Sequence, residues 1–260
     1  MNDYNPLISI IIAVYNGGAY LKDALDSIIQ QEYKNLEILV IDGGSTDNTL
    51  EIINSYKKFI KYTISERDNG IYDAWNKGIR AASGEWIAFI GADDILYPHA
   101  YQAYVSHIAN LDVKNTLEFV SSRIDLVDND LNKIETVGLP WNWYDFKKKM
   151  ITWHVGTLHS KALFAKYGLF NPNYKISGDY ELLLRPKRDL IASYVPVVTV
   201  MMRSGGVSNT LFYKAIDETY RAKIQNGIFN PYLGTLLKYN NKVKLFVKLF
   251  LIRIGFVKKL

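Results

Sequence analysis

Four short apolar runs alternate with helical patterns in the first part of the chain, and this alternation restricts the fold more than any other feature. The runs occupy residues 7–14, 36–41, 62–65 and 86–90. The first is nearly continuous and rich in β-branched residues, which is typical of a central strand covered on both faces. Because strands that alternate with helices favour a right-handed, doubly wound parallel sheet, we expect an α/β fold.

The chain after residue 96 follows a different pattern. Residues 117–127 alternate in polarity, which favours a strand in a mixed or antiparallel region. A polar stretch at residues 127–131 predicts the tip of a hairpin. We therefore expect one domain over residues 1–210 and a helical C-terminal extension over residues 211–260.

Polar side chains follow three of the predicted strands and would meet at one edge of the sheet. Asn16 follows the first strand, Asp42 ends the second, and Asp93 and Asp94 follow the fourth. Ligands of open α/β sheets bind at this edge. Two adjacent carboxylates repel each other, so they are best tolerated beside Mn²⁺ or Mg²⁺, which prefer oxygen ligands. The alternative is that Asp93 or Asp94 only caps a helix starting near Pro98.

The paired glycines of these loops do not form a known phosphate-binding motif. Gly17-Gly18 and Gly43-Gly44 lack the spacing of the dinucleotide fingerprint, and the sequence contains no Gly-x-x-x-x-Gly-Lys-Ser/Thr loop. A nucleotide would then be held by carboxylates and a metal ion rather than by a glycine-rich anion site.

The positive charge of the chain is concentrated near its C-terminal end, which argues against a nucleic-acid-binding protein. Residues 211–260 carry a net charge of +8 and residues 1–210 a net charge of −3, within a total of +5. A nucleic-acid-binding core is not expected, because phosphate contacts need basic residues on the binding face.

The sequence has no cysteine, which excludes disulfides and thiolate metal sites. The polar N-terminus has no signal-peptide pattern, so we expect the catalytic part to stay in the cytoplasm.

The end of the chain, residues 242–260, combines six basic residues with dense apolar ones. Four of the cations fall on one side of a helical wheel: Lys244, Lys248, Lys258 and Lys259. Such a helix is suited to an anionic membrane surface, with Lys242 and Arg253 reaching out to the headgroups. The alternative is a helix docked on the body or on a second copy in a homodimer. We favour the membrane, because a docked helix has less use for six uncompensated cations.

Five short motifs occur in order along residues 7–210. They are Val14-Tyr-Asn16, Val40-Ile-Asp42-Gly-Gly-Ser-Thr-Asp47, Asp68-Asn-Gly-Ile-Tyr-Asp73-Ala-Trp-Asn76-Lys-Gly78, Gly84-Glu-Trp86 and Ala92-Asp93-Asp94. The set resembles the inverting family 2 nucleotide-sugar glycosyltransferases, and is closest to the bacterial enzymes that build surface polysaccharides such as lipopolysaccharide and capsule. The resemblance implies the Rossmann-like GT-A fold, with a mixed sheet flanked by helices, a UDP-sugar donor and Mn²⁺ or Mg²⁺.

The resemblance also assigns roles around the donor. Asp42 would bond the uracil base, Asp93 would contact the ribose or the metal, and Asp94 would bind the metal that bridges the diphosphate. The family more often has Asp-x-Asp, and a slip of one residue would exchange the roles of Asp93 and Asp94. Tyr15 and Asn16 would also contact the donor.

Four further residues would line the donor pocket or close it. Asp68, Asp73 and Asn76 would lie near the ribose and sugar, although Asp73 and Asn76 would equally suit a solvated helix face. Arg203 begins a glycine-containing loop, residues 203–208, that would close over the diphosphate.

Asp179 follows Gly178 at the start of an apolar helical pattern, where the simplest role is a helix cap. By the resemblance, Asp179 is the catalytic base. A base on the acceptor side cannot be one of the metal-binding carboxylates, because inverting transfer needs it opposite the leaving group. Glu181 is the alternative base, although a helix would turn it about 200° away. His154 would ligate the metal, contact the diphosphate or pack beside Trp153.

We therefore expect an inverting hexosyltransferase at the cytoplasmic face of the inner membrane, bound there peripherally. It would transfer a hexose from a UDP-sugar to a saccharide, most simply one carried on a polyprenyl diphosphate. One alternative is a nucleotidyltransferase, although residues 15–18 lack the basic residue such an enzyme needs after the first strand. The other is a carbohydrate-binding protein without activity.

Overall fold

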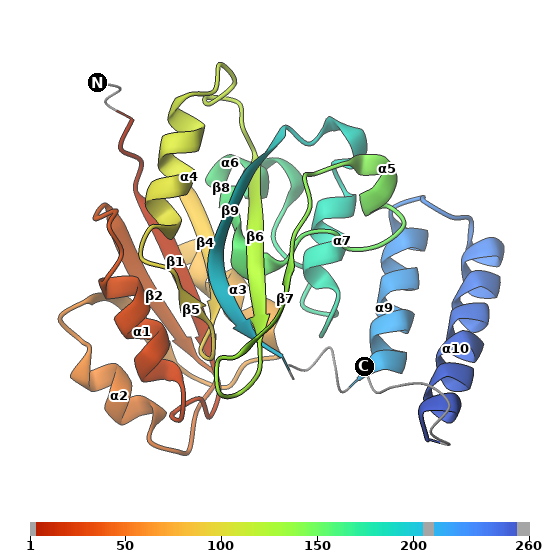
Figure 1. Cartoon of the computed structure of the whole chain (residues 1–260), viewed down its shortest axis with the longest axis horizontal. Helices are drawn as coiled ribbons and strands as arrows, with labels where there is room; N and C mark the ends of the chain where they lie inside the picture. Colours follow the sequence, from red (N-terminus) through yellow and green to blue (C-terminus); the bar gives the residue numbers. More distant parts are fainter. Residues whose placement is uncertain (1–3, 205–210, 254–260) are drawn as a thin grey trace.

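The computed structural model describes residues 4–204 and 211–253 (Figure 1). Its first part alternates strands with helices, as predicted. The elements are β1 (Ile8–Val14), α1 (Leu21–Ile29), β2 (Leu36–Asp42), α2 (Thr49–Ser55), β3 (Ile60–Ser65), α3 (Ile71–Ala81) and β4 (Trp86–Gly91).

The second part contains more strands and shorter helices. Its elements are β5 (Ile95–Leu96), α4 (Ala100–Ala109), β6 (Phe119–Val127), β7 (Lys133–Val137), α5 (Trp143–Phe146), the 3₁₀ helix η1 (His154–Gly156), β8 (Thr157–Ser160), α6 (Lys161–Tyr167), α7 (Gly178–Leu184), η2 (Lys187–Asp189) and β9 (Ala192–Arg203). Two long helices follow, α9 (Phe212–Gln225) and α10 (Pro231–Arg253).

The strands of the described residues form one sheet in the order β3-β2-β1-β4-β8-β6-β9-β5, and β7 pairs with β6. The β3-β2-β1-β4 part is parallel, whereas β8 runs antiparallel to both β4 and β6. The β6–β7 pair is the predicted hairpin. The mixed sheet flanked by helices is therefore confirmed.

Alternate residues of the central strands bury against two separate helical layers. Ile10 and Ile12 of β1 pack in one core with α1, α2 and α4. Ile11, between them, packs in a second core with α3, α6 and α7. This burial on both faces explains why the first strand is an unbroken apolar run.

The two C-terminal helices lie side by side at the end of the molecule opposite α1 and α2 (Figure 1). Helix α9 packs against α7, and α10 packs against α9. Asp217 of α9 forms ion pairs with Lys238, at 3.8 Å, and with Lys242, at 2.7 Å. Lys242 therefore faces α9, which corrects the prediction that it reaches toward lipid headgroups. Two other predicted cations of this segment, Lys258 and Lys259, lie outside the described residues. Among those residues, no helix has both the length and the apolarity needed to cross a bilayer.

Candidate active site

A cavity of about 910 Å³ opens at the carboxyl ends of β1, β2 and β4. Four of the residues predicted to bind the donor line it: Tyr15, Asn16, Asp68 and Asp93. The other predicted residues are not among those that line it: Asp42, Asp73, Asn76, Asp94, His154, Asp179 and Arg203. The structure thus places the cavity at the edge of the sheet that the sequence indicated.

Asn16 connects the loop after β1 to the loop after β2 by hydrogen bonds. Its side-chain oxygen accepts a hydrogen bond from the Thr46 backbone N–H at 2.8 Å, and its own N–H donates to Ser45 Oγ at 2.8 Å. Its φ of 49° lies in the left-handed region, which asparagine tolerates better than most residues. Asn16 therefore shapes the wall of the cavity as well as lining it.

Asp42 is fully buried, and its carboxylate is hydrogen-bonded to its own loop and to the end of β3. It accepts hydrogen bonds from the backbone N–H groups of Gly44 and Ser45 and from the hydroxyls of Ser45 and Ser65. These bonds hold Gly43 and Gly44 against the cavity. A direct contact between Asp42 and a base would require some of them to rearrange.

Asp93 and Asp94 fold back over the end of β4. A Cβ added to Gly91 would lie 2.7 Å from Asp94 Oδ2 and 2.8 Å from Asp93 Oδ1, so a side chain at this position would displace both carboxylates. Asp94 is buried, and its Oδ2 accepts the Gly91 N–H at 2.7 Å. Burial raises the pKa of Asp94 to about 7, and the neighbouring charge of Asp93 adds to the rise.

This carboxylate pair fits a divalent cation. Burial first, and then the neighbouring charge of Asp93, raise the pKa of Asp94, and a nearby cation would favour its ionised form. Within the described residues, no group of three Asp, Glu or His side chains is placed to hold a metal. A cation at Asp93 and Asp94 would therefore take its other ligands from a bound diphosphate and water, as Mg²⁺ commonly does.

Arg203, at the end of β9, contacts Asp93 and Tyr20 without lining the cavity itself. Its Nη1 donates to the Asp93 carbonyl at 2.5 Å, and its guanidinium lies 4.8 Å from the centre of the Tyr20 ring, which lines the cavity. Its positive charge also lowers the pKa of Asp94, against the effect of burial. Most of the predicted closing loop, residues 205–208, lies outside the described residues.

The polar residues of α3 and of the loop before it have different surroundings. Asp68 lines the cavity and pairs with Lys77, and burial raises its pKa. Asp73 accepts the Asn69 N–H at 3.0 Å and so fixes the first turn of the helix. Asn76 is buried, and its amide bonds both the carbonyl, at 2.8 Å, and the N–H, at 3.0 Å, of Phe170. Asn76 therefore neither reaches the cavity nor faces solvent.

Asp179 lies at the start of α7, in contact with Tyr72 of α3. The Tyr72 hydroxyl donates to Asp179 Oδ1 at 3.2 Å. A Cβ on Gly178 would lie 2.7 Å from the Tyr72 ring, so glycine allows this close approach. The neighbours of Tyr72 along α3, Ile71 and Ala74, line the cavity. Asp179 is therefore joined to the helix that forms one side of the cavity.

His154 lies beside Asp179 rather than in a three-ligand group with Asp93 and Asp94. Its Nδ1 is 3.8 Å from Asp179 Oδ2, and its ring packs 5.1 Å from that of Trp75. Burial lowers the pKa of His154, while the charges of Asp179 and Asp93 oppose that change. Burial raises the pKa of Asp179, and His154 partly opposes the rise. The placement favours a partner of the base over a metal ligand.

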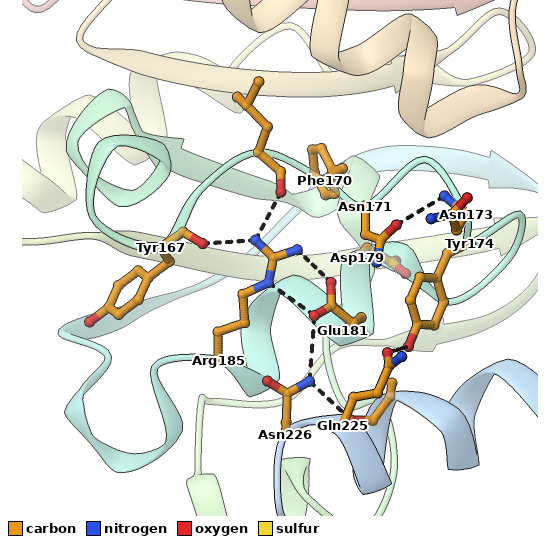
Figure 2. A network of polar contacts seen from close by, with 12 residues as sticks. Tyr167, Phe170, Asn171, Asn173, Tyr174, Asp179, Glu181, Arg185, Gln225 and Asn226 are labelled. Carbon is orange, nitrogen blue, oxygen red and sulfur yellow. Dashed lines mark hydrogen bonds and ion pairs between the residues drawn. The ribbon is translucent and has the colours of Figure 1, made fainter.

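Glu181, the alternative base, is engaged in a separate network (Figure 2). Its carboxylate accepts from Arg185 Nε at 3.0 Å and from Arg185 Nη2 at 2.5 Å. Asn226, the residue directly after α9, donates to the same carboxylate at 3.4 Å. Arg185 also bonds the carbonyls of Tyr167 and Leu169, so the network joins three segments of the fold. Of the two carboxylates predicted as a base, Glu181 is therefore the one engaged by an arginine.

The family model described as Glycosyl transferase family 2 matches residues 9–168, more than half of the chain. The chain belongs to glycosyl transferase family 2. An uncharacterized glycosyltransferase of Rickettsia typhi is 35% identical over 191 residues, which are 70% of this chain and 58% of that protein. The chain thus spans little more than half the length of this relative. A PGL/p-HBAD biosynthesis glycosyltransferase of Mycobacterium bovis is 31% identical over 215 residues, 80% of this chain and 82% of that protein.

Two solved structures share this fold. S. aureus TarS has a TM-score of 0.65 and 17% identity, covering 84% of this chain and 65% of that chain. A mannosyltransferase from Pyrobaculum calidifontis, in complex with GDP-Man and Mn²⁺, has a TM-score of 0.66 and 18% identity, covering 88% and 66%. The likeness confirms the predicted GT-A fold for this family 2 chain.

Two contributors to the site were not identified from the sequence of this family 2 chain. Tyr72 lies within a quoted motif, but only the fold shows that its hydroxyl reaches Asp179, 107 residues later. Glu218 of α9 contacts the segment before Asp179, and nothing in the local sequence distinguishes it from a surface acid. Its burial on a helix of otherwise mixed polarity is the property that sets it apart.

Proposed function

We propose that the protein catalyses inverting transfer of a hexose from a UDP-sugar to a hydroxyl group of a saccharide acceptor. One observation carries this proposal: a half-buried carboxylate, Asp179, is bonded to Tyr72 of α3, whose neighbours line the cavity, and lies on an element separate from the Asp93–Asp94 pair. Inverting transfer needs this separation, because the incoming hydroxyl and the departing diphosphate lie on opposite faces of the sugar.

Asp179 would remove the proton from the acceptor hydroxyl as the new glycosidic bond forms. Its Oδ1 is held by the Tyr72 hydroxyl and the Tyr180 N–H, at 3.2 and 2.8 Å. Oδ2, on the His154 side, is then the oxygen placed to accept the proton. A pKa raised by burial makes the carboxylate a stronger base than a solvated aspartate.

The leaving side would use Asp93 and Asp94 with Mn²⁺ or Mg²⁺. A cation bound there would neutralise the negative charge that builds up on the departing nucleoside diphosphate. The complexes of TarS with UDP and UDP-GlcNAc and of the mannosyltransferase with GDP-Man and Mn²⁺ support a nucleotide sugar and a divalent ion. Asn16 and Asp68 would contact the nucleotide from the cavity wall.

We further propose that α10 binds the cytoplasmic face of the inner membrane peripherally, which would suit an acceptor carried on a polyprenyl diphosphate. One face of α10 exposes an apolar stripe, whose side chains are 47–85% exposed: Tyr232, Leu236, Tyr239, Val243, Phe246, Val247 and Phe250. Lys244, Lys248 and Arg253 of the same helix are exposed and positive. Apolar surface with adjacent cations fits an anionic lipid surface.

Release of UDP from UDP-sugars tests the transfer reaction. We expect release that depends on Mn²⁺ or Mg²⁺ and on a saccharide acceptor, and that stops when EDTA removes the metal. Product with an inverted anomeric configuration, read by proton NMR, completes the test. UDP-sugar binding without turnover would contradict the proposal and favour a carbohydrate-binding protein.

Vesicle sedimentation tests the membrane contact. The full chain should bind vesicles containing phosphatidylglycerol more tightly than neutral ones, and binding should weaken with salt. A Phe246→Ser, Phe250→Ser variant should lose this binding, whereas Ile134→Ser, which removes an exposed apolar side chain from β7, should keep it. A homodimer that requires Phe246 and Phe250, without vesicle binding, would contradict the proposal.

A further inference from the structure

The segment just before Asp179 is held by a buried carboxylate from α9. Glu218 accepts hydrogen bonds from three consecutive backbone N–H groups: Lys175 at 2.9 and 3.0 Å, Ile176 at 2.8 Å and Ser177 at 3.0 Å. Glu218 is only 5% exposed. Hydrogen bonds to an ionised acceptor are about twice as strong as neutral ones, so this carboxylate fixes the path of the segment.

The same segment is held on its other side by α3. The Tyr72 hydroxyl donates to the Ile176 carbonyl at 2.7 Å, while the Ile176 N–H donates to Glu218. Lys175 Nζ bonds the Asn69 carbonyl, in the loop that carries Asp68 into the cavity. Residues 175–177 therefore connect α9, α3 and the donor loop directly before the base.

Helix α9, which carries Glu218, is held in this region by further contacts. Tyr174 donates to Gln225 at 2.6 Å, and Asn226 donates to Glu181 of α7 at 3.4 Å (Figure 2). Ala222 of α9 is fully buried in the core that contains α7. The Glu218 carboxylate thus reaches residues 175–177 from a helix that these contacts hold in place.

We propose that Glu218 is a positioning residue for Asp179. The proposal rests on the proposed function, in which Asp179 is the base. The segment 175–177 leads into α7 without a side-chain cap at Ser177, so the Glu218 bonds replace the contacts that would otherwise define the start of this helix. Without them, the Asp179 carboxylate would lose its alignment with Tyr72 and with the acceptor.

The expected effect is on turnover and not on donor binding. A displacement of about 1 Å in a catalytic group costs about 100-fold in rate, so Glu218→Ala should lower kcat by about that factor. The KM for the UDP-sugar should stay unchanged, because Glu218 does not line the cavity. Glu218→Gln should retain most of the activity, since one amide oxygen can still accept the three N–H groups that meet at Oε2.

The test combines steady-state kinetics with amide hydrogen exchange of the full chain. In Glu218→Ala, exchange should accelerate in peptides covering residues 175–179 and kcat should fall, with Glu218→Gln restoring both. Asp217→Asn is the matched control, since this neighbouring carboxylate of α9 pairs only with Lys238 and Lys242 in the described residues. If Glu218→Ala does not fold, Glu218→Asp, which keeps the charge but shortens its reach, takes its place.

The outcomes separate the two proposals. Unchanged exchange, or faster exchange with an unchanged kcat, would overturn the positioning role while leaving the proposed function intact. A rise in the KM for the donor without loss of kcat would also overturn it. A wild-type chain that transfers no sugar would refute the proposed function and, with it, the role of Glu218.

Discussion

The hydroxyl of Tyr72 offers a direct way to perturb the proposed base without removing it. It donates to the Ile176 carbonyl at 2.7 Å and to Asp179 Oδ1 at 3.2 Å. Burial raises the pKa of Tyr72 well above its usual value, so the hydroxyl keeps its proton at any assay pH. Because this donor stabilises the ionised form of Asp179, the substitution Tyr72→Phe should raise the pKa of Asp179.

The size of this change follows from the bond lengths. A hydrogen bond to a charged group contributes about 1.5–3 kcal/mol, and the longer of the two shared bonds belongs at the lower end. About 1.4 kcal/mol corresponds to one pKa unit, so we expect a rise of about one unit. The acid limb of the profile of kcat/KM against pH should then move by about one unit to higher pH, since protonated Asp179 cannot accept the proton.

The assay is UDP release measured across pH with a saturating divalent ion. Tyr33→Phe is the matched control, because the Tyr33 hydroxyl also donates to a backbone carbonyl, that of Pro6 at 2.6 Å, and neither residue lines the cavity. An acid limb that stays in place in Tyr72→Phe, moves to lower pH, or moves equally in Tyr33→Phe would refute the reasoning.

Two substitutions test the division between structural and catalytic groups. Asn76→Ala removes both bonds to Phe170 and should lower the free energy of unfolding by about 1–3 kcal/mol, measured in urea, while UDP affinity stays the same. A loss of UDP affinity without a loss of stability would instead indicate that Asn76 contacts the donor. Glu181→Gln weakens the pairing with Arg185 and should lower stability by about 2 kcal/mol yet keep transfer in the surviving folded protein; selective loss of transfer would make Glu181 the base.

The parallel half of the sheet could be predicted from the sequence because its strands are buried on both faces. Strands predicted at residues 7–14, 36–41 and 86–90 match β1, β2 and β4 closely. The carboxylates at their ends were predicted to share an edge for the same geometric reason. Strand β8 was missed, because it has only four residues and lies between β4 and β6 in an order that the chain does not follow.

The start of α10 was predicted too late, although the sequence contains a signal for it. The helix begins at Pro231, where proline suits the first turn, and Asn230 Oδ1 accepts the Leu233 N–H at 2.8 Å. The pairing of Lys242 with Asp217 had no such signal, since the two residues lie on different helices and meet only through packing.

The contacts around the base were the least predictable part. Glu218 and Tyr72 reach the segment before Asp179 from positions about 40 residues later and more than 100 residues earlier. Local patterns report helix faces and caps, and they carry no information on which distant backbone a buried carboxylate will bond. The fold was therefore predictable from periodicity, whereas the support of the base required the structure.

The separation of the base from the metal-binding carboxylates is the central claim, and Asp179→Asn tests it most directly. The measurement is kcat for sugar transfer beside the affinity for UDP with Mn²⁺, both on the full chain. We predict that kcat falls by about 10²–10⁴-fold, the contribution typical of a general base, while UDP affinity is unchanged. Wild-type transfer by the variant, or an equal loss of UDP binding and transfer, would contradict the claim.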